Sequence, residues 1–171
     1  MTDADVFFSG YDPPVVVVTA RSTDGPAGCL VGFTTQCSIH PPRLLVCLSV
    51  LNHTHEVARS AETLGVHLLG DGQHDLASLF AEVTGDAVDK FAQVEWRPGV
   101  SGTPMLSHCA AYLEGGILKR VALGDHDAFL LEVLDVGVGD ATGSLRQSDV
   151  RTLDAGHPAD EVLSARHEVQ E

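Results

Sequence analysis

The sequence predicts a mostly β fold, an antiparallel barrel with a few short helices added to it. Two observations support this prediction: many short β-branched or apolar runs are separated by turn residues, and few segments show helical spacing. The predicted strands and helices do not alternate regularly, and no GxGxxG motif follows the first strand. A Rossmann fold is therefore disfavoured, and a barrel is favoured.

The first three predicted strands lie in the N-terminal third of the chain. Residues 15–19, VVVVT, form a β-branched run with a double proline before it and turn residues after it. Apolar character resumes at residues 29–33, then gives way to polar residues and a second double proline. Residues 44–51, LLVCLSVL, are apolar nearly throughout, so this strand is expected to be covered on both faces.

Two helices and further strands are predicted after the third strand. Asn52 or Thr54 is a suitable N-cap for a short helix that runs to Leu64. Apolar residues recur at helical spacing in residues 73–83 and predict a second helix. We expect the remaining strands at residues 66–69, 94–96, 110–118 and 128–138, and a terminal helix within residues 156–171.

Length and composition predict one globular domain. The 171 residues fit a single domain over residues 1–171, with a core at about 15–139 and a C-terminal extension at 140–171. Apolar residues make up 44% of the chain and charged residues 20%, which excludes a disordered chain. No apolar run approaches the ~18 residues of a membrane span, and the acidic N-terminus does not resemble a signal peptide. We therefore expect a cytoplasmic protein without a membrane partner.

The net charge of −14 disfavours nucleic acid as a partner, because phosphate contacts require clustered Lys and Arg side chains. Salt screens distant carboxylates over roughly 8 Å, so an anionic cofactor can still bind beside a few local cations such as Lys90 or Arg43. The four cysteines form no CxxC pair, and we expect reduced, buried thiols and no metal site.

Residues 27–43, AGCLVGFTTQCSIHPPR, resemble the flavin reductase-like FMN-binding split-barrel family. That family has a glycine, a short apolar and hydroxyl-rich stretch, a serine before a double proline, and then an apolar strand. Three further motifs match the family in the same order: NHTH at residues 52–55, DKF at 89–91 with Trp96 after it, and GDH at 124–126. The resemblance covers about residues 15–139.

The resemblance implies a split-barrel homodimer that holds FMN in a groove at the interface. FAD is the alternative flavin, and NADH or NADPH is the cosubstrate. In the family, the flavin lies along the segment between the glycine and the double proline, the phosphate lies near the end of the third strand, and the DKF lysine lies near the flavin. The cofactor-binding residues implied here are Val31, Gly32, Phe33, Thr34, Thr35, Gln36, Ser49, Asn52, Thr54, Lys90 and Phe91. The GDH histidine, His126, is the implied catalytic residue where nicotinamide or substrate approaches.

Physical reasoning about the same residues agrees with the resemblance. A glycine at position 32 permits close approach of the backbone to a ligand. A helix that starts near Thr54 favours a phosphate at its N-terminus. We expect Lys90→Ala and Thr54→Ala each to weaken FMN binding by about 1 kcal/mol or more. Leu30 replaces a threonine common in the family, and the C-terminal part lacks its aromatic and basic ending.

The leading functional prediction is an NAD(P)H-dependent flavin reductase, with a monooxygenase component as a candidate recipient of reduced flavin. The alternative is a non-catalytic FMN-binding electron carrier or flavin store on the same barrel. A hydrolase based on Ser38 is disfavoured, because no GxSxG elbow surrounds it. His53 and His55 form an HxH pair, which we interpret as the polar start of a helix in preference to a metal site.

Overall fold

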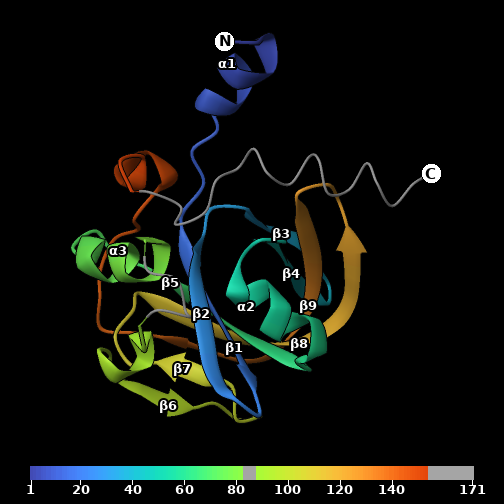
Figure 1. Cartoon of the computed structure of the whole chain (residues 1–171), viewed down its shortest axis with the longest axis vertical. Helices are drawn as coiled ribbons and strands as arrows, with labels where there is room; N and C mark the ends of the chain where they lie inside the picture. The colour runs from blue at the N-terminus through green and yellow to red at the C-terminus, as the bar shows by residue number, and fades with distance from the viewer. Residues whose placement is uncertain (83–87, 154–171) are drawn as a thin grey trace.

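The computed structural model describes residues 1–82 and 88–153, and most of the strand residues among them belong to one antiparallel sheet. Its seven strands follow the order β2-β1-β5-β8-β9-β4-β3, so β2 and β3 are the two edges. The sheet curls into an open barrel (Figure 1). The strands are β1 (Val16–Ser22), β2 (Gly25–Val31), β3 (Thr34–Ile39), β4 (Pro42–Ser49), β5 (Thr63–Leu68), β8 (Ala111–Ala122) and β9 (His126–Val138). This arrangement confirms the predicted mostly β class.

Short elements surround the sheet. Strands β6 (Trp96–Pro98) and β7 (Pro104–Leu106) pair as a separate hairpin. Helix α2 (His53–Ser60) packs against β1, β2 and β4, and α3 (His74–Glu82) packs against β2. Helix α1 (Asp3–Ser9) projects away from the body (Figure 1). Two 3-10 turns complete the described chain, η1 (Lys90–Ala92) and η2 (Gln147–Val150).

Two apolar clusters lie on opposite faces of β1. Val16 and Val18 belong to the cluster inside the curled sheet, together with Phe129 and α2 residues. Val15 and Val17 belong to the cluster under α3 and η1, together with Phe80. Successive residues of a strand point to opposite faces, so the run of valines is buried on both sides. This double burial explains why β1 was readable as a strand.

Several predicted bounds differ from the structure. The segment 34–39, interpreted only as a polar stretch, forms the edge strand β3. Strand β4 is fully buried only at Val46 and Leu48, while Leu45 and Cys47 are partly exposed, because none of the described elements fully covers that face. The prediction of cover on both faces was therefore wrong. Helix α2 ends at Ser60, short of Leu64, because Thr63 begins β5.

One predicted strand is shorter than expected, and two observed elements were not predicted. Residues 94–96 are a strand only from Trp96 onward, and α1 and β7 were not predicted. Val83, the predicted end of the second helix, and the predicted terminal helix lie outside the described residues. Over residues 1–82 and 88–153, no helix is both long enough and apolar enough to cross a membrane.

A buried histidine ties the small hairpin to the large sheet. The Nδ1 of His67 donates to the carbonyl of Val17 at 3.0 Å, and its Nε2 accepts from the amide of Leu106 at 3.0 Å. Burial lowers the pKa of His67 from 6.5 to about 4, so the ring is neutral in the folded protein at neutral pH. Because the neutral ring has one donor and one acceptor, both of its nitrogens are satisfied.

Candidate functional site

The connection between β2 and β3 forms one wall of the candidate site. Val31 ends β2 with its side chain buried in the barrel, and Gly32 and Phe33 cross to β3. The Phe33 side chain is 51% exposed, while its carbonyl accepts a hydrogen bond from the Cys47 amide at 2.9 Å. The backbone is therefore fixed to β4 while an aromatic ring stays open to a ligand.

His126 lies beside that ring. The ring centroids of Phe33 and His126 are 5.0 Å apart, with an interplanar angle of 56°. His126 begins β9, where it pairs with Ser49 of β4, and its Nδ1 lies 2.8 Å from a carboxylate oxygen of Asp125. Two motifs far apart in the sequence, the segment before the double proline and the GDH triplet, thus meet at one place. The catalytic role of His126 remains a prediction.

The start of α2 continues from the same strand end. Asn52 donates its amide to the Ser49 carbonyl at 3.0 Å. Its side-chain oxygen accepts from the Thr54 amide at 2.9 Å, so Asn52 is the N-cap. One of the two predicted N-cap residues, Asn52, is therefore confirmed. The sheet register places Ser49 opposite His126, and Asn52 is hydrogen-bonded to Ser49, so the start of α2 follows directly from the Phe33–His126 pair.

Thr54 points away from this surface. Its side chain is buried and hydrogen-bonded to Cys29, whose thiol pKa is raised by burial to about 11. His55, one residue later, is also buried, and its Nε2 lies 2.7 Å from a carboxylate oxygen of Asp127. The HxH pair thus includes a histidine held by a carboxylate of β9. In the described part of the chain, no group of three or more His, Cys, Asp or Glu is arranged to hold a metal ion.

Lys90 and Phe91 lie behind β2 and do not line the open surface. The Lys90 ammonium donates to the carbonyls of Gly28 and Phe80, each at 3.3 Å, and the residue is 6% exposed. Burial lowers the pKa of Lys90. The Phe91 ring packs edge-on against Phe80 and Trp96, with centroids 5.7 and 5.8 Å away. Both residues therefore have a packing role in the structure. Neither side chain lines the open surface on which the predicted contact with the cofactor would have to occur.

Lys90→Met should lower the free energy of unfolding by about 1–3 kcal/mol, because two buried carbonyl groups lose their donor while the packing is largely kept. Chemical denaturation measures this difference. Lys119→Met, a change at an exposed position of β8, is the matched control and should stay within about 0.5 kcal/mol of the parent. Equal effects of the two variants would contradict the packing role of Lys90.

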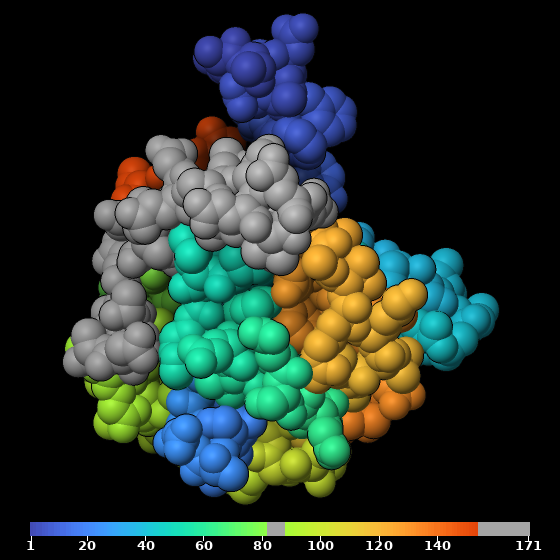
Figure 2. Space-filling model, turned by 45° about the vertical axis from the view of Figure 1, so that its right-hand side comes forward, coloured from blue at the N-terminus to red at the C-terminus, as the bar shows by residue number. Residues whose placement is uncertain are grey.

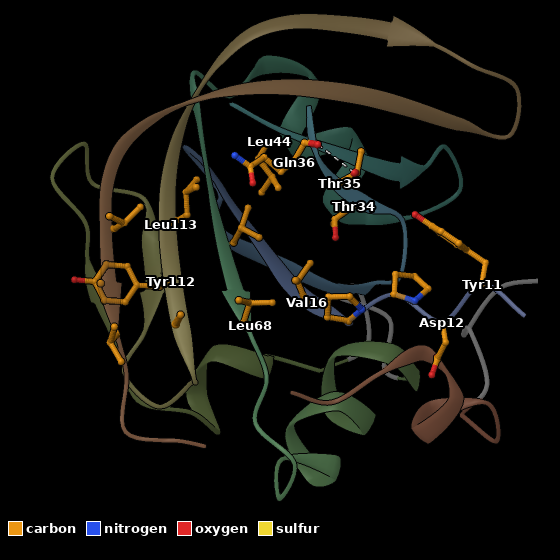
Figure 3. Close-up of a pocket in the computed structure, with 17 residues that line it drawn as sticks. Tyr11, Asp12, Val16, Thr34, Thr35, Gln36, Leu44, Leu68, Tyr112 and Leu113 are labelled. Atoms are coloured by element: carbon orange, nitrogen blue, oxygen red, sulfur yellow. Dashed lines mark hydrogen bonds between the residues drawn. The ribbon is translucent and has the colours of Figure 1, made fainter. Parts of the chain in front are cut away.

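An apolar cavity of about 800 Å³ opens at the end of the barrel (Figure 3). Three predicted cofactor residues, Thr34, Thr35 and Gln36, line it. Its other walls include apolar side chains from the inner face of the sheet: Val16, Leu44, Val66, Leu68, Leu113 and Val136. Phe33, Ser49, Asn52 and His126 do not line it. The predicted cofactor segment therefore lies between the apolar cavity and a second surface, the corner formed by Phe33, Ser49, Asn52 and His126.

Sequence reasoning missed one residue at the corner, Gln147. The side-chain amide nitrogen of Gln147 lies 3.5 Å from the point where a Cβ on Gly32 would stand. Gln147 belongs to η2, and its backbone amide donates to the Pro13 carbonyl at 3.0 Å. The only signal in the sequence was its place in the C-terminal part, which departs from the family pattern. No local motif links Gln147 to Gly32, because they are 115 positions apart.

Comparison with known proteins gives one consistent result. A family profile described as "Flavin reductase like domain" matches residues 8–153. The FMN reductase (NADH) RutF of Pseudomonas syringae pv. syringae is 36% identical over 132 residues, which cover 75% of this chain and 71% of that protein. The stachydrine N-demethylase reductase subunit Stc3 of Rhizobium meliloti is 33% identical over 135 residues, and the match covers 72% of this chain and 56% of Stc3.

Among solved structures, the NADH:FAD oxidoreductase SgcE6 of Streptomyces globisporus has a TM-score of 0.77 and 28% sequence identity. The match covers 90% of this chain and 88% of that chain. The family profile match over residues 8–153 includes every residue named above at the candidate site and the cavity.

Proposed function

Because the chain belongs to the flavin reductase-like family, we propose that it is a flavin reductase that moves hydride from a nicotinamide nucleotide to FMN at the corner formed by Phe33, Ser49, Asn52 and His126. The observation that supports this most directly is the meeting of the β2–β3 connection with the GDH histidine. FAD is the alternative flavin, as the name of SgcE6 illustrates for that relative.

The residues at the corner fit a flavin. A flavin needs a flat apolar contact, polar groups for its pyrimidine edge, and a site for its phosphate. Phe33 offers the aromatic contact, and the backbone at Gly32 carries no side chain that would hold a ring away. Gln147 adds an amide with both donor and acceptor atoms. The α2 N-terminus supplies its positive dipole end next to Ser49.

Each group of the chain then has a positioning task. A bound flavin supplies the electron chemistry by accepting hydride from the nicotinamide. The hydrogen bond between the Phe33 carbonyl and β4 fixes the β2–β3 connection, against which the flavin and nicotinamide rings would come together. Asp125 orients the His126 imidazole through its contact at Nδ1, leaving Nε2 for the nicotinamide carboxamide or the substrate. No charged catalytic acid is required for hydride transfer itself.

Steady-state turnover tests this function. Purified protein with FMN and either NADH or NADPH is followed at the absorbance band of the reduced nicotinamide, and continuous oxidation is expected with at least one nucleotide. Protein that stays yellow but oxidises neither nucleotide would favour the electron carrier or flavin store. Transfer of reduced flavin to a monooxygenase is our proposal for its use. The name of Stc3, a reductase subunit of a demethylase, supports it.

His126→Ala should raise the KM for the nicotinamide nucleotide about tenfold, which corresponds to about 1.4 kcal/mol of lost binding. The reason is the loss of a hydrogen-bonding group beside the predicted hydride path. The matched control is His74→Ala, at an exposed position of α3, which should leave both KM and kcat unchanged. If His126→Ala behaved like this control, the nicotinamide would have to bind elsewhere.

We also propose a homodimer as the working form. Its support is the apolar cavity at the barrel end, whose walls include exposed valine and leucine side chains. Apolar surface of this kind on a water-exposed protein marks an interaction site. A second copy seated there would cover the cavity and adjoin the cofactor segment at Thr34, Thr35 and Gln36.

A further inference from the structure

Helix α1 is an apolar arm that no element of the described part of the chain covers. Figures 1 and 2 show it standing clear of the body. None of its residues is buried, and Phe7 and Phe8 are 70% and 65% exposed. Tyr11, just after the helix, is exposed as well. Two adjacent phenylalanines and a tyrosine on a projecting segment are an unusual surface for a chain of this charge.

The sequence nevertheless supports α1 as a helix. Thr2 and Asp5 form a reciprocal capping box, in which each side chain accepts from the other's backbone amide. A helix of seven residues is marginal in water even with a good cap. Helix α1 thus has a stabilising cap but leaves its aromatic rings exposed. This combination is typical of a helix that becomes buried against another molecule.

The base of the arm is anchored so that the arm points outward. Asp12 accepts hydrogen bonds from the amide and the hydroxyl of Ser148, at 2.7 and 2.8 Å. Arg146 donates to the Asp12 carbonyl at 2.9 Å, and Arg151 donates to the Ser9 carbonyl at 3.1 Å. These bonds hold the end of α1 and the residues after it against the 146–151 segment, and so oppose folding of α1 back onto its own barrel. The direction of the arm thus favours a partner molecule.

The apolar cavity begins where the arm ends. Tyr11 and Asp12, labelled in Figure 3, line it together with Pro13 and Pro14. On the other side, the inner face of β9 leaves apolar side chains open, with Val136 59% and Val138 88% exposed. Leu68 of β5 extends the same surface. Arm and cavity are therefore continuous parts of one face.

We propose that two copies of the chain exchange their arms, so that Phe7 and Phe8 of each copy pack into the apolar cavity of the other; this rests on the homodimer proposed above. A two-fold interface requires one surface to be self-complementary, and a face that carries both an apolar arm and an apolar cavity meets that requirement. One two-fold rotation seats both arms at once, and the assembly closes at two copies.

The exchange brings the partner's aromatic rings next to the cofactor segment. Thr34, Thr35 and Gln36 line the cavity that the arm enters, and this segment continues from Phe33 at the corner. Each cofactor site is then supported by the other copy's α1. Loss of the arm should therefore weaken both dimerisation and flavin binding.

Photo-crosslinking between isotopically distinct copies tests this proposal. Phe8 is replaced by the photo-crosslinker p-benzoylphenylalanine, and light and ¹⁵N-labelled chains are mixed, unfolded, refolded together and irradiated. The expected products join residue 8 of one isotope to peptides of β5 or β9 of the other. The matched control places the crosslinker at Val100, an exposed position in the turn between β6 and β7, and should yield no such products.

Sedimentation of the parent chain separates failure of this inference from failure of the dimer. A dimer whose crosslinks from position 8 stay within one isotope, or do not reach β5 or β9, would overturn arm exchange and leave the homodimer standing. A monomer at micromolar concentration would overturn both. Phe7→Ser with Phe8→Ser changes only exposed positions, so it keeps the fold and should shift the dimer to monomer and weaken FMN binding at least severalfold.

Discussion

Phe129→Ala should lower the free energy of unfolding by about 3–5 kcal/mol, the largest effect we expect from a single substitution. The Phe129 side chain is fully buried in the cluster inside the barrel, between β9 and α2. Its ring meets the His55 ring edge-on at 6.1 Å, and the Arg120 guanidinium lies 5.8 Å from its centroid. Truncation would leave a cavity beneath α2 and remove the surface on which His55 rests. Chemical denaturation gives the difference directly.

Phe33→Ala is the matched control for that measurement. The same atoms are removed from a ring that is half exposed, so the free energy of unfolding should change by less than about 1 kcal/mol. Flavin affinity should fall more with Phe33→Ala than with Phe129→Ala, when it is measured by titration of the folded protein. Similar losses of stability in both variants would mean that the two aromatic positions have been assigned to the wrong environments.

Acidification from about pH 7 to about pH 5 should cost about 2 kcal/mol of stability through His67 alone. Burial lowers the pKa of His67 from 6.5 to about 4 in the folded protein. Between these values the unfolded chain binds a proton that the folded chain does not. The contribution of the neutral His67 ring to stability is therefore complete above about pH 6.5 and is lost progressively as the pH falls toward 4.

His67→Gln isolates this contribution, because glutamine keeps a donor and an acceptor but does not titrate in this range. The variant should be less stable than the parent at pH 7 and should depend less on pH between 7 and 5. His108 acts with the opposite sign. Hydrogen bonds to Asp140 and Glu95 raise its pKa, so the stability that protonated His108 contributes is lost as the pH rises through its raised pKa. The test is thus the difference between parent and variant; identical pH profiles would refute the role of His67.

The core strands were predictable from the sequence because their buried positions form continuous runs of apolar residues. The valines of β1 are buried on both faces, and the buried residues of β9, Ala128, Phe129 and Leu131, lie at the start of its predicted apolar run. Helix α1 was not predicted, because Val6, Phe7 and Phe8 are adjacent and do not repeat at helical spacing. Strand β3 was read as a polar segment because it is an exposed edge.

The candidate site was predictable only as a set of motifs. The order of the motifs along the chain does not reveal which side of a strand each side chain occupies. Lys90 matched its motif, yet its ammonium points into the body and binds two carbonyls. Thr54 likewise faces Cys29. The cavity and Gln147 depend on contacts between distant parts of the chain, which spacing alone does not encode.

Anaerobic mixing of the FMN-loaded protein with NADH, and separately with NADPH, tests the central claim most directly. The visible absorbance of the bound flavin should bleach in a single turnover with at least one nucleotide, and the spectrum should return when oxygen is admitted. A chain that binds FMN but keeps its oxidised spectrum with both nucleotides, or that does not bind FMN at all, would contradict the account.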